Sequence, residues 1–256
     1  MRAFLAFFKK ELLEYSRSGK LILFGILFVL FGIMNPAIAK LTPWLMETMA
    51  AELAQSGMSV TAIEPDAMAS WVQFFKNIPM ALIVFVLVMS NVFTKEYASG
   101  TLILMLTKGV ARYKVYLAKA GALLLLWSVG YAVCFAVTYV YTDYFWDQSI
   151  LHHLVPTVLH WYLFGVFCIW LVLLFSTVAN TQTTVLLLTG ASVLASYLAG
   201  MLPKIKHLMP TALMNSAALL VGKESPQDYL PAIILTLAMS CVALIAAIPL
   251  FNKKAL

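Results

Sequence analysis

Residues 157–202 read TVLHWYLFGVFCIWLVLLFSTVANTQTTVLLLTGASVLASYLAGML. Two apolar runs, 157–179 and 183–202, flank the short polar sequence Asn180-Thr181-Gln182, and neither run contains Asp, Glu, Lys or Arg. A helix needs about 20 apolar residues to cross a bilayer. The stretch therefore predicts two membrane-spanning helices that are joined by a tight turn.

The rest of the chain has the same character. Hydrophobic residues make up 62% of the 256 residues and charged residues 11%, whereas soluble domains are about 45–50% apolar and about 25% charged. Four more apolar segments of spanning length lie at about 21–39, 77–93, 115–142 and 230–251. We therefore predict an all-α membrane protein with six transmembrane helices, in which residues 1–256 form a single transmembrane domain.

The positions of Lys and Arg predict the orientation in the membrane. With both termini in the cytoplasm, twelve of the 17 Lys and Arg residues fall in cytoplasmic segments and five in outer ones. Cytoplasmic loops carry such an excess of Lys and Arg. We expect a multi-pass protein of the plasma membrane with cytoplasmic termini. The net charge of +6 is then a topology signal, and no nucleic acid is expected as a partner.

The first segment, residues 1–19, has an apolar stripe. Phe4 or Leu5, Phe8, Leu12 and Tyr15 recur at the spacing of one helix face, and basic residues stand on the remaining surface. This pattern predicts an amphipathic helix that lies in the inner membrane interface. The alternative is an ordinary flanking segment of the first span.

Two segments between the predicted spans also have apolar patterns. Residues 203–229 contain an apolar stretch from Leu208 to Val221, which is too short to span a bilayer and fits a re-entrant or interfacial element. In the first outer loop, Pro43 to Gln55 favours a separate helix with Thr42 as its N-cap.

Residues 95–114, KEYASGTLILMLTKGVARYK, form a charged segment around a short apolar run. Ser99 is expected to cap a helix that begins near Gly100-Thr101, and Gly109 to end it in a left-handed turn. Such a helix has about two turns and is apolar on every face, so it needs a cover. The bundle, the lipid headgroups and a groove in a partner protein are three candidates for that cover.

Several kinds of chemistry lack the residues that they need. Asp, Glu, Lys and Arg, which would couple transport to ions, are absent from residues 21–39, 77–93, 120–142, 157–179, 183–202 and 230–251. The nucleotide-binding pattern GxxxxGK[ST] does not occur either. No metal site is expected. A membrane enzyme would have to use Asp143, Asp147, His152 and His153, and that alternative stays open at this point, as does a scaffold or sensor without transport.

One pattern resembles a known family. Glu96-x-x-x-Gly100-Thr101-Leu102-x-x-x-Leu106, followed by Val110-x-Arg112 and then Lys119 before a long span, is similar to the cytoplasmic signature of ABC-2 type permeases. The family motif P-V/I-S-R appears here as Gly109-Val110-Ala111-Arg112, without its proline and serine. The resemblance implies an elbow helix at 1–19, a coupling loop at 95–114 and a re-entrant pair of helices at 203–229.

The resemblance also implies partners and roles. Two ATPase subunits, which bind ATP and Mg, would drive two permease chains, the second being an identical copy or a paralogue, and this chain would have no cofactor and no catalytic role. The substrate, a hydrophobic or amphipathic molecule such as an antimicrobial peptide, drug or lipid-like compound, would be exported between the permeases, which contact membrane lipid. Glu96 and Arg112 would pair within the coupling loop. The residues implied in ATPase coupling are Glu96, Gly100, Thr101, Leu102, Met105, Leu106, Gly109 and Arg112.

Overall fold

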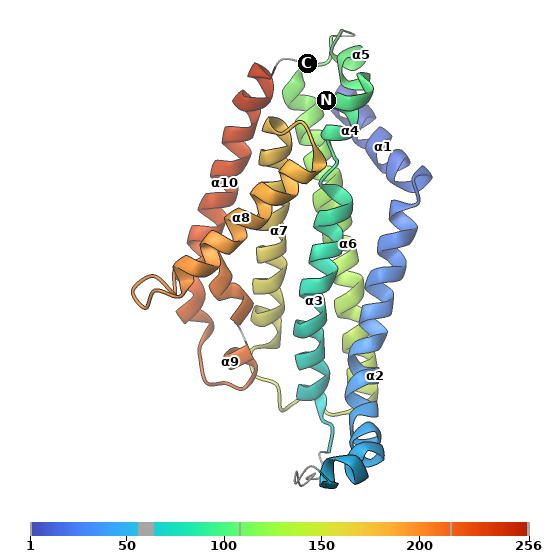
Figure 1. The fold of residues 1–256 in the computed structure, drawn as a ribbon, viewed down its shortest axis with the longest axis vertical. Helices are drawn as coiled ribbons and strands as arrows, with labels where there is room; N and C mark the ends of the chain where they lie inside the picture. The colour runs from blue at the N-terminus through green and yellow to red at the C-terminus, as the bar shows by residue number, and fades with distance from the viewer. Residues whose placement is uncertain (1, 56–63, 108, 216, 255–256) are drawn as a thin grey trace.

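The computed structural model describes residues 2–55, 64–107, 109–215 and 217–254, which form an all-helical bundle (Figure 1). In chain order the α-helices are α1 (Arg2–Arg17), α2 (Lys20–Gln55), α3 (Ala67–Met89), α4 (Thr94–Ser99), α5 (Thr101–Thr107), α6 (Arg112–Phe145), α7 (Leu154–Val178), α8 (Gln182–Gly200), α9 (Ala217–Leu220) and α10 (Leu230–Lys253). Two 3₁₀ helices, η1 (Pro210–Asn215) and η2 (Pro226–Tyr229), flank α9.

The predicted fold class is confirmed. Six helical segments in the described part of the chain are long and apolar enough to cross a membrane. Four of them contain a predicted span entirely, and the predicted spans 157–179 and 183–202 end one and two residues beyond their helices. The turn at 180–182 separates α7 from α8, as the sequence predicts. Helix α2 extends well beyond its predicted span of 21–39, whereas α6 exceeds 115–142 by three residues at each end. With 36 and 34 residues, the two helices measure roughly 54 and 51 Å at about 1.5 Å per residue.

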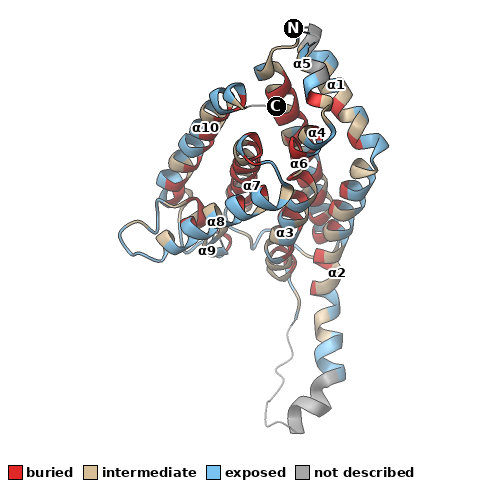
Figure 2. Cartoon of the chain, turned by 45° about the horizontal axis from the view of Figure 1, so that its top comes forward, coloured by how far each residue is buried: buried red, intermediate tan, exposed pale blue. Residues whose placement is uncertain are grey.

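Helix α7 is the centre of the bundle. It packs against α3, α6, α8 and α10, and it is the most deeply buried of the six spans. Figure 2 shows buried residues concentrated on α3, α6 and α7, whereas the outer faces of α8 and α10 are exposed. Aromatic rings fill the core between these helices, among them Trp71, Phe74, Phe85, Trp127, Tyr131 and Phe164.

A polar network joins the first three spans. Pro36 has no N–H to offer the carbonyl oxygen of Gly32, and the Thr138 hydroxyl of α6 donates to that oxygen at 3.2 Å. The Asn35 amide donates to Thr138 and accepts from Asn77 of α3. The Thr138 hydroxyl thus satisfies the Gly32 carbonyl oxygen that Pro36 leaves without a helical donor inside α2. The network connects α2, α3 and α6.

Residues Pro43 to Gln55 are helical, as predicted, but the predicted helix start at Thr42 is wrong. Helix α2 continues through Pro43, and the Thr42 hydroxyl donates back to the Ile38 carbonyl oxygen at 2.7 Å. Because Thr42 is satisfied within the helix, it does not act as an N-cap. The first span and the helical part of the outer loop are one element.

The segment between α8 and α10 folds back onto the bundle. Helix η1 packs against α7, α8 and α10, and α9 packs against α7. Leu213, Leu219 and Leu220 are completely buried. This geometry agrees with the predicted re-entrant or interfacial element at 203–229, which consists of short helices and does not cross the bundle.

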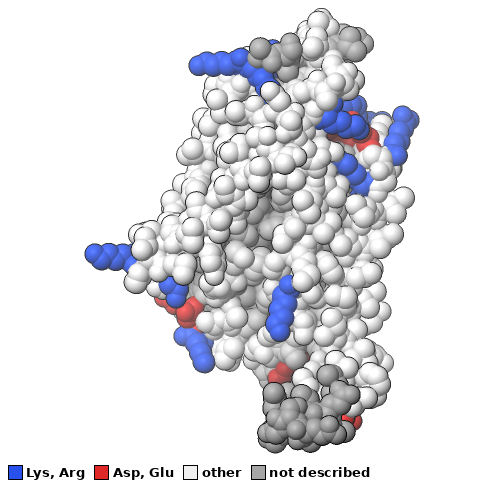
Figure 3. Space-filling model, in the orientation of Figure 1, with Lys and Arg blue, Asp and Glu red and all other residues white. Residues whose placement is uncertain are grey.

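The bundle has two polar ends. Both termini lie at one end, which we call the termini end, together with α1, α4 and α5 (Figure 1). The opposite end contains η1, α9 and η2. Figure 3 shows charged side chains at two levels, separated by an uncharged band, on the face that it displays. A chain with this distribution fits a bilayer that surrounds the band.

Candidate functional site: the termini end of the bundle

Helix α1 presents one face to the bundle. Ser18 and Gly19 separate it from α2, and Gly19 has a φ of 73°, which a residue without Cβ adopts at little cost. Phe8, Leu12 and Tyr15 pack against the core, as their spacing predicts, whereas Leu5 is exposed. The helix therefore docks on α6 and α2. Its place in the membrane interface stays a prediction.

The docked face of α1 also carries a carboxylate. Glu11 is only 1% exposed, and both of its oxygens lie 3.0 Å from the Lys119 ammonium of α6. Lys119 is 2% exposed and also lies 3.0 Å from an oxygen of Glu96 in α4. One buried ammonium thus holds two carboxylates from two different helices.

Lys10 completes this arrangement, which we call the charge cluster (Lys10, Glu11, Glu96 and Lys119). Its ammonium lies 2.9 Å from Glu11 and 3.0 Å from Glu96. Partial burial disfavours the charged ammonium, but the attraction of Glu11 and Glu96 outweighs that effect and raises the pKa of Lys10. The cluster connects α1, α4 and α6 through ion pairs that are largely hidden from solvent.

Two further residues surround the cluster, the half-buried Glu14 and the exposed Lys95. Glu14 pairs with Lys10 at 3.0 Å and with Lys95 at 3.4 Å. Burial raises the pKa of Glu14, but the hydrogen bond and charge of Lys10 prevail and lower it below its ordinary value. Glu11, Glu14 and Glu96 lie close enough together to share a metal ion. The lysine ammonium groups contact both oxygens of Glu11 and of Glu14 and one oxygen of Glu96, so the arrangement is better described as an ion-pair network.

The predicted coupling loop forms two short helices. Gly100 ends α4 in the left-handed conformation, with a φ of 66°, and α5 begins at Thr101. Ser99 therefore lies at the end of α4 and does not cap α5 in the expected way, although its hydroxyl contacts that of Thr101 at 2.9 Å. Gly109 has a φ of 81° and follows α5, which confirms the predicted left-handed turn.

Helix α5 has a covered and an uncovered side. Leu102 is completely buried and Leu106 packs partly against the core, whereas Ile103 is 44% exposed. The side chain of Met105 lies outside the described residues. The bundle thus covers one side of this apolar helix and leaves Ile103 without a cover. Beside Ile103 lies a cavity of 290 Å³, which is lined by Glu96, Tyr97, Ala98, Leu102, Ile103, Asn180 and Lys254.

Arg112 joins the start of α6 to the end of α10. Its guanidinium donates to the carbonyl oxygens of Phe251 and Lys254 at 2.8 Å and of Asn252 at 3.3 Å. These carbonyls belong to the last turn, where no helical N–H remains to bind them and where the helix dipole favours a cation. The Glu96–Arg112 pair suggested by the resemblance is therefore wrong, because each residue has other partners.

Lys254 ties a further helix to the same region. Its ammonium donates to the carbonyl oxygens of Val178 and Ala179 at the end of α7, and it lies 3.9 Å from the centroid of the Tyr97 ring. Partial burial lowers the pKa of Lys254. The ends of α7 and α10 are thereby linked to α4.

Sequence reasoning missed Glu11, which is central to the cluster. Glu11 follows Phe8 by three positions and precedes Tyr15 by four, so it belongs to the buried stripe of α1. A carboxylate on the apolar face of an amphipathic helix indicates a buried cation partner. No local pattern identifies Lys119 as that partner, because 108 positions separate the two residues.

The residues of the enzyme alternative have local partners. Asp147 accepts hydrogen bonds from the backbone N–H and the hydroxyl of Ser149, which lower its pKa. Asp143 accepts from Gln148, and the backbone N–H of His152 donates to Leu220. Within the described residues, these side chains do not form a group with metal-ligand geometry.

Aromatic residues of the spans pack in the core of the bundle. Phe85, Trp127, Tyr131 and Phe164 are at most 4% exposed and pack against one another or against neighbouring rings in the core. Phe135 and Trp170 pack against the same core. The centre of the chain is thus filled with side chains.

Comparison with known proteins gives one family. A family model described as ABC-2 family transporter protein matches residues 5–256, nearly the whole chain. A search of curated proteins found no match.

Proposed function

Because the chain belongs to the ABC-2 family of transporter proteins, we propose that it is the permease subunit of an ATP-driven exporter. A separate ATPase subunit binds ATP and Mg and supplies the energy, because this sequence has no nucleotide-binding loop. The observation that carries the proposal is the half-covered helix α5 at the termini end, in a chain whose family is a transporter family.

Helix α5 is the proposed contact with the ATPase. Two apolar turns are marginal in water, and the bundle covers Leu102 but leaves Ile103 exposed. Because Ile103 is 44% exposed, a partner groove that accepts it would gain less than half of the roughly 1.5–3 kcal/mol that full burial of an exposed side chain gives. The other coupling residues, Gly100, Thr101 and Gly109, set the entry and exit of α5. In this proposal the termini end faces the cytoplasm.

The charge cluster is the proposed route of force from α5 into the spans. A displacement of α4 and α5 would pull on Glu96, which is bound to Lys10 of α1 and Lys119 of α6. Arg112 and Lys254 would pass the same displacement to the ends of α10 and α7. The termini end can thus move as a unit in response to the ATPase.

The substrate path lies, in this proposal, between two permease copies. The core of one chain is filled with aromatic rings, and the outer faces of α8 and α10 are exposed and apolar. A hydrophobic or amphipathic substrate, such as an antimicrobial peptide, drug or lipid-like molecule, suits a path with such walls. Two ATPases and a second copy or paralogue of the permease complete the transporter, which exports the substrate from the plasma membrane.

Co-purification tests the ATPase contact. The protein would be isolated from membranes of its host and the eluate assayed for ATP hydrolysis. Ile103→Glu is the test variant, and Ile150→Glu is the matched control, because Ile150 has nearly the same exposure, 45%, and lies in the connection between α6 and α7. We expect wild type and Ile150→Glu to bring down an ATP-hydrolysing chain and Ile103→Glu to lose it.

Two results would contradict the proposal. If wild type isolates no ATPase, the chain is a scaffold or sensor and does not belong to an ATP-driven exporter. If Ile103→Glu retains the ATPase as well as Ile150→Glu does, the exposed side of α5 is not the contact. Reconstitution of the isolated complex in vesicles then measures whether ATP hydrolysis moves a fluorescent amphipathic peptide.

A further inference from the structure

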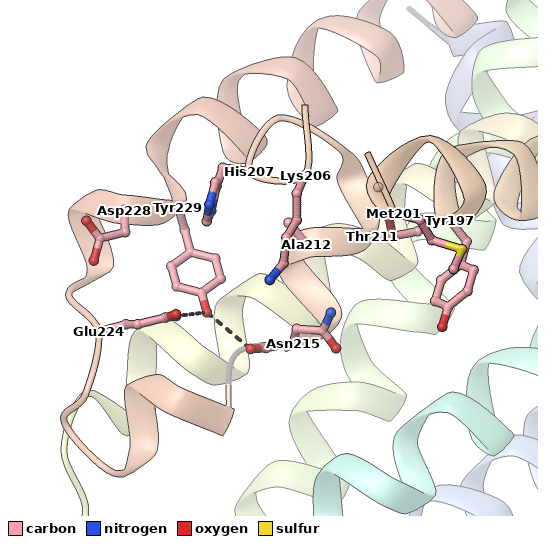
Figure 4. Close-up of a pocket in the computed structure, with 11 residues that line it drawn as sticks. Tyr197, Met201, Lys206, His207, Thr211, Ala212, Asn215, Glu224, Asp228 and Tyr229 are labelled. Atoms are coloured by element: carbon pink, nitrogen blue, oxygen red, sulfur yellow. Dashed lines mark hydrogen bonds between the residues drawn. The ribbon is translucent and has the colours of Figure 1, made fainter. Parts of the chain in front are cut away.

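A cavity of 540 Å³ lies at the opposite end of the bundle. The end of α8, the loop that follows it, η1 and the segment before α10 form its walls. Its volume lies within the range of about 300–1,000 Å³ that is typical of small-ligand sites. Figure 4 shows that Lys206 lies between Tyr229 on one side and Met201 and Tyr197 on the other, and that His207 lies above Tyr229.

The cavity has a cationic and an anionic part. The Tyr229 hydroxyl donates to one oxygen of Glu224 and fixes this carboxylate at the wall. Asp228 is already engaged by the hydroxyl and backbone N–H of Ser225. Among the described residues, neither Glu224 nor Lys206 forms an ion pair, so both charges are available to a ligand. A ligand with one positive and one negative group matches this pair.

The wall opposite Glu224 is apolar and continues outside the cavity. Tyr197 and Met201 are 56% and 69% exposed at the end of α8. Leu194 and Leu198 continue the same exposed surface along this helix, which is the least buried of the six spans. The charged loop and this apolar helix meet at the boundary of the uncharged band (Figure 3). A ligand with a charged head and an apolar tail fits such a boundary.

We propose that this cavity binds the headgroup of a zwitterionic phospholipid of the phosphatidylethanolamine type. Lys206, with His207 beside it, binds the phosphate, and Glu224 binds the ammonium. The acyl chains lie along the exposed face of α8, over Leu194 and Leu198. A soluble zwitterion with the same headgroup chemistry has no apolar chains to contact the exposed face of α8. A lipid therefore fits the site better than a soluble ligand does. The proposal does not depend on an ATPase partner.

Lipid binding is measured on the purified protein in non-ionic detergent by native mass spectrometry. Phosphatidylethanolamine is compared with phosphatidylglycerol, which has the phosphate but no ammonium, and with glycerophosphoethanolamine, which has the headgroup but no chains. Lys206→Met and Glu224→Gln are the test variants. Lys204→Met is the matched control, because Lys204 is an exposed lysine of the same loop that does not line the cavity.

For wild type we expect phosphatidylethanolamine to bind about tenfold more tightly than phosphatidylglycerol, the effect of one charge-assisted hydrogen bond. We expect it to bind at least about tenfold more tightly than glycerophosphoethanolamine, because that probe has no acyl chains to bury on α8. Lys206→Met weakens binding of both lipids about tenfold. Glu224→Gln, which keeps an acceptor for Tyr229, removes only the preference for phosphatidylethanolamine, and Lys204→Met changes neither affinity.

Equal or tighter binding of phosphatidylglycerol by wild type overturns the assignment of Glu224 to the ammonium. Equal effects of Lys206→Met and Lys204→Met overturn the phosphate site. Tight binding of glycerophosphoethanolamine identifies a soluble ligand and overturns the lipid. None of these results bears on the ATPase contact at the termini end, so this inference and the proposed function fail separately.

Discussion

Replacement of Lys119 by Met tests the charge cluster most directly. Lys119 holds three oxygens of Glu11 and Glu96 at 3.0 Å, and its side chain is 2% exposed. With charge centres about 4 Å apart and an effective dielectric constant of about 20, each carboxylate attracts the ammonium by about 4 kcal/mol, or about 8 kcal/mol together. The cost of removing the ammonium from water, several kcal/mol, offsets part of this attraction.

The variant leaves Glu11 buried with Lys10 as its remaining cation. Removal of one partner from a buried ion pair costs about 3–5 kcal/mol, because the other charge stays uncompensated. We therefore expect Lys119→Met to lower the free energy of unfolding by about 3–5 kcal/mol. Unfolding in mixed micelles with increasing sodium dodecyl sulfate, followed by circular dichroism, measures this free energy.

Two further variants make the result specific. Lys95→Met removes an ammonium that is 63% exposed and 3.4 Å from Glu14, and it should cost less than about 1 kcal/mol. Glu11→Gln in the Lys119→Met background neutralises the stranded carboxylate, so the two effects should be non-additive by about 1–3 kcal/mol. A loss of stability no larger in Lys119→Met than in Lys95→Met, or strict additivity with Glu11→Gln, would refute the reasoning.

Three further predictions concern packing, a helix terminus and pH. A Cβ at Gly165 would overlap the Trp127 ring, whereas one at Gly190 would meet nothing within 4 Å. We expect Gly165→Ala to lower the free energy of unfolding in detergent by about 1–3 kcal/mol and Gly190→Ala not to lower it. Arg112→Gln removes the hydrogen bonds from the guanidinium to the last turn of α10, which we expect to lower the local stability of that turn by about 1.5–3 kcal/mol. The backbone amides of the turn should then exchange hydrogen at least about tenfold faster. Unchanged exchange would show that Arg112 does not hold the end of α10. Because the pKa of Glu14 is lowered, its ion pairs stabilise the fold above its ordinary pKa of 4.5 and are lost as the pH falls through the folded-state pKa. The difference in melting temperature between wild type and Glu14→Gln should therefore be constant at neutral pH and shrink in acid. A difference that grows in acid would contradict this sign.

Sequence predicted the spans well for a local reason. Inside a bilayer each backbone group must bond within its own helix, so a run of about 20 apolar residues is both necessary and nearly sufficient for a span. The turn at 180–182, the left-handed Gly109 and the apolar stripe through Phe8 and Tyr15 are equally local. Each depends on residues within a few positions of one another.

Local patterns failed where a residue had more than one structural use available. Pro43 and Thr42 have the pattern of a helix start, but α2 passes through both because the Thr42 hydroxyl finds its acceptor one turn back at Ile38. Ser99 has the pattern of an N-cap, but it ends α4. In both cases the preceding helix determined the structure at the residue, and the type of residue at that position did not.

Sequence by itself therefore determined the class of protein, the six spans and the segment 95–114 as a distinct feature. Only the tertiary structure decided which charges meet. Glu96 pairs with Lys10 across 86 positions, and Arg112 binds Phe251 across 139. Such partners depend on how each helix is rotated and how far it slides along its neighbour. Packing of the whole bundle sets the rotation and the displacement of each helix, and the residue pattern within one helix does not predict either of them.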